Sequence, residues 1–134
     1  PSRAEPLAPP PQVADWGFDV ETLTPLLEQA RDAAGADAAF VTDPRGVVVA
    51  SVGAFAEDAA GPYGSRLVVA LERAREISGS AAEETSVVVE AGGRALTAFT
   101  ASTPDGLLVT IGFQGTSPTP RPVREALRRV LAGR

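Results

Sequence analysis

The sequence predicts an α+β domain with three layers, in which helices cover both faces of a five-stranded antiparallel sheet. Three observations support this class: segments with helical periodicity, valine- and alanine-rich segments of strand length, and short turn-forming links between neighbouring strands. Because parallel strands need a crossover of about a dozen residues, links this short force neighbouring strands to be antiparallel. The expected order of elements is therefore α-β-β-α-β-β-β-α.

The first helix is expected over residues 23–34. Thr24 followed by Pro25 is typical of a helix start with proline in the first turn, and Gly35 is a typical stop. The apolar residues of this segment fall near one face, so the helix should pack against the sheet.

A β-hairpin is expected next, with strands over residues 38–42 and 47–50. The link Asp43-Pro44-Arg45-Gly46 has the residue order that a type I turn favours. The valines of the second strand do not alternate with polar residues, which indicates that both faces of this strand are covered.

The second helix is expected over residues 62–78 and ends at Gly79. Residues 65–72 could alternatively form a strand, but the length of the segment and its charged continuation favour a helix. One face of this helix carries apolar residues at helical spacing: Tyr63, Leu67, Ala70, Leu71, Ala74 and Ile77.

Three further strands and a helix complete the predicted domain. The strands are expected over residues 85–90, 95–101 and 107–113, with turn-forming residues between them. The last helix follows a Pro-rich loop at residues 117–122, and its apolar stripe consists of Val123, Leu127, Val130 and Leu131. We expect the first and third helices on one face of the sheet and the second helix on the other.

The chain of 134 residues is expected to form one domain preceded by a tail. Residues 1–16 are rich in Pro and Ala and form the expected tail, and residues 17–134 form the domain. Trp16 and Phe18 are the first apolar anchors and should pack the incoming chain against the domain. The tail lacks the apolar centre of a signal peptide, and no apolar run approaches the roughly 20 residues that cross a bilayer. We therefore expect a soluble, cytoplasmic protein.

Side chains for catalysis are scarce in this sequence. It contains no Cys, His, Met, Lys or Asn, and all 12 basic residues are Arg. These absences remove Cys nucleophiles, thiolate metal sites, Ser-His-Asp triads and the lysines that form Schiff bases or hold nucleotide phosphates. We expect a binding protein rather than an enzyme, without a metal ion or another cofactor.

The charge is distributed unevenly along the chain. The net charge is −5, but residues 121–134 contain five Arg and a single Glu. The acidic remainder argues against nucleic acid as a partner. The Arg-rich end could dock on an acidic surface or could be a solvated helix face.

Candidate contact residues lie on the second helix and on the strand after it. Val68 and Val69 fall outside the apolar stripe, beside Glu72 and Arg75. They could contact another protein, although isolated exposed apolar residues are common. Gly64 could allow a close approach between helices or could serve the turn into its own helix. A strand as rich in valine as the next one would need a cover at a sheet edge, either its own copy or a loop.

The remaining candidates are interpreted as solvated charges. Two acidic pairs, Glu57 with Asp58 and Glu83 with Glu84, could be metal ligands or acid–base pairs, but no second cluster of suitable geometry can be inferred. Arg45 at a turn tip could act as an arginine finger on a GTPase, but such arginines are usually solvated.

The order of elements and several landmarks resemble the roadblock family, which includes dynein light-chain roadblock proteins and bacterial mutual gliding protein B. The resemblance covers residues 23–131, and its most telling part is GADAAFVTDPRGVVVASVG at residues 35–53. There a small apolar strand, an Asp-x-x-Gly turn and a second strand ending in Ser-x-Gly look like the family's opening hairpin. The Pro-rich loop at residues 114–122 and the PYG at the start of the second helix depart from the family's pattern.

The resemblance implies a homodimer in which the second helix and the third strand pair across a two-fold axis and form one continuous sheet. It also implies a small Ras-like GTPase as a partner, since bacterial members commonly work beside one and some stimulate its hydrolysis. The residues expected at the dimer or partner interface are Gly64, Val68, Val69, Glu72, Arg75, Ser86 and Val88.

The leading hypothesis is a non-catalytic homodimeric regulator or scaffold that binds a small Ras-like GTPase and modulates its nucleotide state or location. Bacterial cell polarity or gliding motility would be the setting. One alternative is a GAF- or profilin-like sensory module that binds a small molecule between the sheet and a helix. Another alternative is a purely structural assembly subunit, dimeric but without a GTPase.

Overall fold

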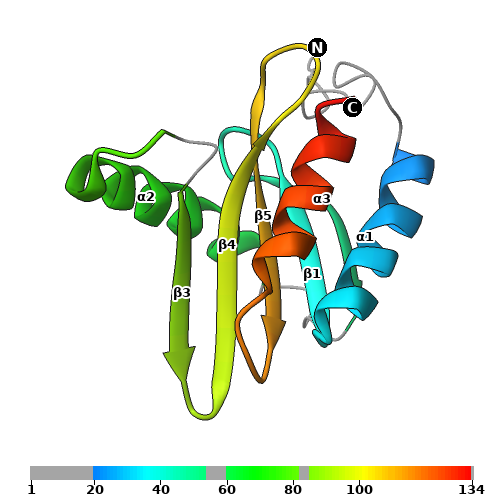
Figure 1. Ribbon diagram of the computed structural model, residues 1–134, viewed down its shortest axis with the longest axis horizontal. Coiled ribbons are helices and arrows are strands. Elements are labelled where there is room, and N and C mark those ends of the chain that lie inside the picture. Colours follow the sequence, from blue (N-terminus) through cyan, green and yellow to red (C-terminus); the bar gives the residue numbers. More distant parts are fainter. Residues whose placement is uncertain (1–19, 54–59, 82–84, 134) are drawn as a thin grey trace, which may run out of the picture.

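The computed structural model describes residues 20–53, 60–81 and 85–133 (Figure 1). Three helices and five strands follow one another in the order predicted from the sequence. The elements are α1 (Val20–Ala34), β1 (Ala38–Thr42), β2 (Val48–Gly53), α2 (Ala60–Ser78), β3 (Ser86–Ala91), β4 (Arg94–Ser102), β5 (Leu108–Gly115) and α3 (Arg121–Leu131). The tail expected over residues 1–16 lies outside the described residues.

The five strands form one antiparallel sheet in the order β2-β1-β5-β4-β3. The hairpin of β4 and β5 is the longest pairing and includes every residue from Ala95 to Ser102. β1 pairs with β5 on one side and with β2 on the other, where the register shifts between Val41 and Thr42. β2 and β3 are therefore the two edges of the sheet.

Helices cover both faces of the sheet, as the predicted three-layer α+β class requires. α1 and α3 lie on one face and α2 lies on the other (Figure 1). The large core, between the sheet and α1 with α3, contains the stacked rings of Phe99 and Phe113, whose centroids are 6.1 Å apart. The small core, between the sheet and α2, has these buried residues: Phe40, Leu67, Leu71 and Ala98.

Several details differ from the prediction. β2 spans Val48–Gly53 instead of residues 47–50, and α2 begins at Ala60 instead of residue 62. α1 begins at Val20 instead of Leu23, so that Pro25 lies inside the helix rather than in its first turn. The cost of a missing proline N–H is offset because Leu23 and Leu27 are both buried in the large core. Ile77 was expected in the apolar stripe of α2 but is 87% exposed, because the end of α2 extends past β3 (Figure 1).

Candidate protein interface

β3 forms a sheet edge beside a projecting helix. Among the described strands β3 pairs only with β4, in a register that runs from Ser86 opposite Phe99 to Ala91 opposite Arg94. α2 crosses behind the sheet and extends beyond β3 (Figure 1). The backbone N–H and C=O groups on the outer side of an edge strand can pair with a further strand.

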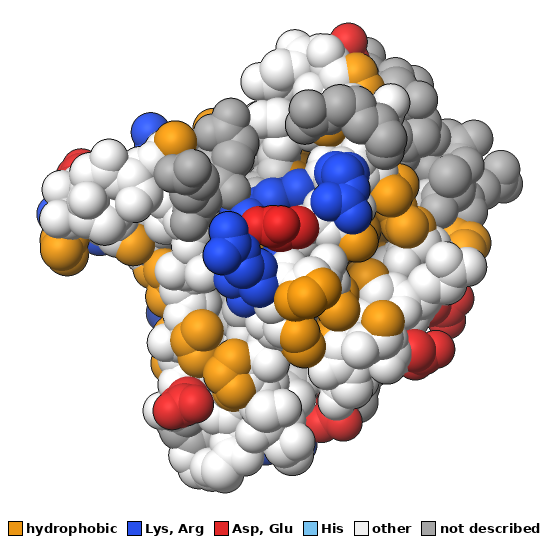
Figure 2. Space-filling view, viewed as in Figure 1, with side chains coloured by type: hydrophobic (Ala, Val, Ile, Leu, Met, Phe, Trp, Pro, Cys, Tyr) orange, Lys and Arg blue, Asp and Glu red, His pale blue; other side chains and the backbone are white. Residues whose placement is uncertain are grey.

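Exposed apolar side chains concentrate at this edge. Of the six large hydrophobic residues that are exposed within the described part of the chain, four lie on α2 or β3. Figure 2 shows hydrophobic side chains at the projecting end of α2 and over the neighbouring strands. Clustering of this kind is typical of surfaces that contact another protein. The four residues are Val69, Ile77, Val88 and Val89, which are 51%, 87%, 43% and 49% exposed.

Val89 and Ile77 were not identified from the sequence as contact residues. Val87 packs against the small core, so Val89, two residues further along β3, lies on the same sheet face as α2. Val88 lies on the opposite face. Because three valines follow one another in β3, the sequence does not show which of them lie on which face of the sheet. Only the packing of α2 against one face distinguishes them.

Six of the seven residues predicted at the interface are at least partly accessible on α2 and β3. They come from two elements that neighbour each other in space, because α2 packs across β3. Val69, Glu72, Arg75 and Val88 are exposed, and Val68 and Ser86 are half-buried.

Gly64 lies inside the domain instead. A Cβ atom at this position would be 2.2 Å from the carbonyl oxygen of Gly46 and 3.1 Å from Cγ2 of Thr42. The absence of a side chain therefore lets α2 approach the turn between β1 and β2. Gly64 belongs to the internal packing of the domain, so the interface proposed below does not include it.

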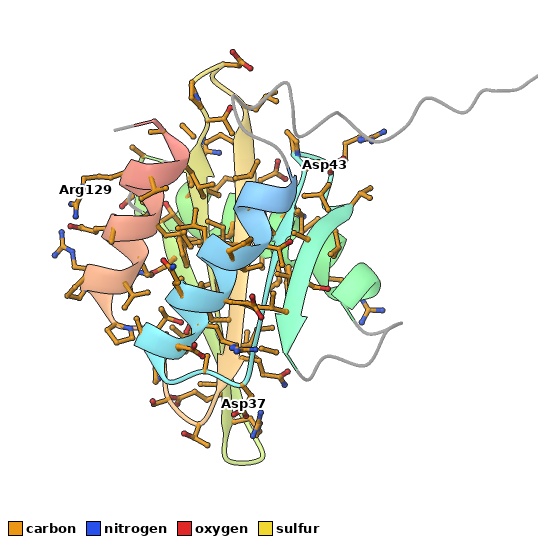
Figure 3. All side chains as sticks on the ribbon, turned by 90° about the vertical axis from the view of Figure 1, so that its right-hand side faces the viewer. Asp37, Asp43 and Arg129 are labelled. Carbon is orange, nitrogen blue, oxygen red and sulfur yellow. The ribbon has the colours of Figure 1, made fainter. Side chains whose placement is uncertain are left out.

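Arg45 is paired within its own turn, at the end of the sheet where Asp43 lies (Figure 3). The buried carboxylate of Asp43 accepts hydrogen bonds from the backbone N–H groups of Arg45 and Val47, both at 2.9 Å. The guanidinium of Arg45 adds an ion pair, with its nitrogen 3.1 Å from Oδ2 of Asp43. Arg45 therefore has a structural partner, and a role as an arginine finger would require this pair to break.

The Arg-rich helix α3 uses one arginine to attach itself to the sheet. Arg128 donates hydrogen bonds to the carbonyl oxygens of Thr100, at 2.8 Å, and Thr85, at 3.3 Å. Its guanidinium also lies 5.2 Å from the centroid of the Phe99 ring, within the range of a cation–π contact. Arg129, by contrast, points away from the sheet (Figure 3). The sequence predicted a docking surface or a solvated face here and did not identify this attachment.

Arg121 and Glu125 form an ion pair on the outer side of α3. The side chains are four residues apart, and Nε of Arg121 lies 2.8 Å from Oε2 of Glu125. The hydrogen bond and the positive charge of Arg121 lower the pKa of the Glu125 carboxyl. Because both side chains are well exposed to solvent, the pair contributes little to stability.

Two of the sequence predictions fall where the structure gives no test. The acidic pairs Glu57–Asp58 and Glu83–Glu84 lie outside the described residues.

Within the described ranges, no group of three or more acidic side chains gathers where it could hold a metal ion. No described helix is both long enough and apolar enough to span a membrane.

Together these elements define a class of domain: a five-stranded antiparallel sheet with two helices on one face and a single helix beside a sheet edge. This is the roadblock fold. The resemblance identified from the sequence is thus confirmed for the fold.

Solved structures share this fold over most of the chain. The gliding protein MglB from Thermus thermophilus has 18% identity and a TM-score of 0.61, covering 86% of this chain and 92% of that chain. A structure described as MglB with tetrameric arrangement has 17% identity and a TM-score of 0.60, covering 84% of each chain. The Roadblock/LC7 domain from Streptomyces avermitilis has 19% identity and a TM-score of 0.56, covering 81% of this chain and 89% of that chain. Neither a family model nor a curated protein matches the chain.

Proposed function

We propose that this protein is a non-catalytic homodimeric regulator or scaffold that binds a small Ras-like GTPase and changes its nucleotide state or its location. The observation that carries the proposal is the concentration of exposed apolar side chains on α2 and on β3, which pairs only with β4 among the described strands. The fold that the chain shares with MglB supports the choice of partner. Such a regulator would act in the bacterial cytoplasm, in cell polarity or gliding motility.

The homodimer is argued from the chemistry of the edge. Pairing β3 with its own copy would satisfy the outer backbone groups of both strands and extend the sheet across a two-fold axis. The two α2 helices would then meet over the joined sheet and cover Val69 and Val89. Glu72 and Arg75 are exposed one turn apart on α2 and carry opposite charges. In an interface made by the same surface of both copies, such a pair is self-complementary.

The regulatory role is argued from the side chains that the chain lacks. It has no His, Lys or Cys to act as a general base, a phosphate-binding lysine or a nucleophile. A partner GTPase would therefore hold the nucleotide and its catalytic groups, while this protein would bind one conformation of the partner more tightly.

The dimer is tested by sedimentation equilibrium with two matched variants. Val69→Glu places a charge on the exposed face of α2, and Val130→Glu places the same charge at a similarly exposed position of α3, on the opposite face. We expect the wild type and Val130→Glu to be dimeric and Val69→Glu to be monomeric with an unchanged far-UV circular dichroism spectrum. A wild type that remains monomeric, or a Val69→Glu variant that remains dimeric, contradicts the proposed interface.

The partner is tested by calorimetry with a small Ras-like GTPase from the same organism, loaded with GDP or with a GTP analogue. We expect binding to one nucleotide state to be the tighter of the two, with hydrolysis or exchange rates measured in parallel. A dimer that binds neither state would instead support the structural assembly subunit.

A further inference from the structure

On the sheet face opposite to α2, the described covering layer ends over β4 and leaves β3 accessible. Phe99 of β4 is fully buried in the large core beneath α3. Thr97 is also buried, and its Oγ1 accepts a 2.9 Å hydrogen bond from the backbone N–H of Thr119, in the loop before α3. The residues of β3 directly opposite these two, Ser86 and Val88, are half-buried and 43% exposed. An accessible strip therefore runs along β3 beside α3.

A row of arginines borders this strip. Arg121, Arg124 and Arg128 follow one another at spacings of three and four residues, so they share one side of α3. That side faces β3, because Arg128 donates a hydrogen bond to the carbonyl oxygen of Thr85, the residue before β3. Figure 2 shows basic side chains over α3 next to hydrophobic side chains over β3 and β4. The arginine row and the strip of β3 thus form a basic wall beside a partly apolar floor.

The positive charge of this wall is only partly balanced. Arg124 and Arg128 donate hydrogen bonds to backbone carbonyl oxygens, which carry no net charge. α3 contains four Arg and a single Glu, a net charge of +3, whereas Glu90 is the one charged residue of β3. The hydrogen bond and charge of Arg121, with the charges of two further arginines, lower the pKa of Glu125. The surface would therefore attract acidic groups.

In the homodimer proposed above, two such strips join to form a trough. Pairing β3 with its own copy places the strands β4, β3, β3 and β4 side by side, with both strips on the same face of the joined sheet. The two β4 strands, which α3 and its preceding loop cover, are then three strand spacings apart, or about 14 Å. An α-helix with its side chains is about 10–12 Å wide, so one helix fits between the two walls.

We propose that this trough binds one amphipathic helix of a partner protein, with its apolar face against the two copies of Val88 and acidic side chains against the two arginine rows. The proposal rests on the homodimer. An extended peptide is less suited to this site, because in the dimer the outer backbone groups of β3 are already paired. The acidic remainder of the chain disfavours nucleic acid, and a flat bilayer does not enter a trough. Because the α2 helices lie on the opposite face, the dimer could hold this helix and a partner on α2 at the same time.

The probe is a synthetic peptide of about 18 residues with Leu at helical spacing on one face and Glu on both flanks. Its matched control has Lys in place of every Glu. Fluorescence anisotropy of the labelled peptides, titrated with the whole chain, measures both dissociation constants. We expect the Glu peptide to bind about tenfold more tightly than the Lys peptide, at one peptide for two chains, with a difference that shrinks as salt is added.

Two variants test the wall and the floor separately. Arg121→Glu reverses one exposed charge of the wall and should weaken binding of the Glu peptide about fivefold. The control is Arg66→Glu, the same change at an exposed position of α2 near the turn between β1 and β2, which should leave the affinity unchanged. Val88→Thr keeps the shape of the side chain but makes the floor more polar, and should weaken binding about threefold.

Sedimentation equilibrium of the same samples distinguishes a failure of this proposal from a failure of the dimer. A dimer that does not bind the Glu peptide, or binds both peptides equally, overturns the helix site alone. A monomeric wild type removes the trough and overturns both proposals. Unchanged affinity in Arg121→Glu also overturns the helix site, and if circular dichroism shows that this variant does not fold, unchanged affinity in Val88→Thr does so. Binding to phosphatidylglycerol vesicles without binding to the Glu peptide would make the surface a membrane contact and equally overturn it.

Discussion

The two faces of the sheet differ in how completely the helices cover them. Among the described residues, thirteen buried hydrophobic residues form the large core on the face with α1 and α3, whereas four form the small core on the α2 face. A single helix covers less of a five-stranded sheet than two helices do, and α2 runs obliquely past β3. The α2 face therefore retains exposed apolar groups at its edge, and binding another protein there would remove them from water.

The largest expected effect is the loss of stability when a buried side chain is removed from either of the two cores. Phe40→Ala removes a fully buried aromatic ring from the small core and should lower the free energy of unfolding by about 3–5 kcal/mol. Because α2 is held mainly through this core, its amides should exchange with deuterium before those of β4 and β5. Leu127→Ala in the large core should cost about 2–5 kcal/mol and release α3 instead of α2. If the amides of all elements exchange at the same rate in both variants, the two faces of the sheet unfold as one unit. The expected difference between the two faces would then be wrong.

A smaller effect is expected where α2 approaches the turn between β1 and β2. In Gly64→Ala the new Cβ would meet the carbonyl oxygen of Gly46, and backbone atoms must shift to relieve the contact. We expect urea unfolding to show a loss of about 1–3 kcal/mol. The control is Glu76→Ala at an exposed position of the same helix, which should stay within about 0.5 kcal/mol of the wild type. Equal stability of the two variants would contradict the tight attachment of α2.

The two faces of β3 can be compared directly at adjacent valines. Val89 lies on the α2 face and Val88 on the opposite face, with similar exposure. Val89→Lys should raise the dissociation constant of the proposed dimer about tenfold, equivalent to about 1.4 kcal/mol, because the lysine would face the joined α2 helices. Val88→Lys should raise it less. Sedimentation equilibrium of both variants measures the two dissociation constants. A larger increase for Val88→Lys than for Val89→Lys would place the interface on the other face of the sheet.

The smallest effect concerns the exposed ion pair on α3. Because Arg121 lowers the pKa of the Glu125 carboxyl from its ordinary value of 4.5, the pair adds stability at pH values above 4.5. That contribution is lost as the pH falls through the lowered pKa of the folded state. In Arg121→Gln the pKa of Glu125, measured by carbon NMR titration, should rise, whereas Arg75→Gln on α2 should leave it unchanged. A pKa that stays low in Arg121→Gln would mean that another group holds the carboxylate.

Much of the fold could be predicted because its signals are local. Pro44 and Gly46 mark one hairpin turn, Pro104 and Gly106 mark another, and short links permit only antiparallel neighbours. Element bounds were less accurate, since α1 begins at Val20, three residues before its predicted start. The contact surface was predicted only in part. Val69 was recognised from helical periodicity, whereas Ile77 was assigned to the core and Val89 was not identified.

By itself, the sequence determined the order of elements, the separation of helices onto two faces of an antiparallel sheet, and the lack of His, Cys and Lys side chains for catalysis. These properties follow from turn chemistry, from hydrophobic periodicity and from composition, all of which act over a few residues. Only the tertiary structure decided which valines of β3 face α2, that Gly64 packs against Gly46, and that Arg128 holds α3 to the sheet. Each of these depends on where two segments distant in the sequence meet, and that position is set by the packing of the whole domain.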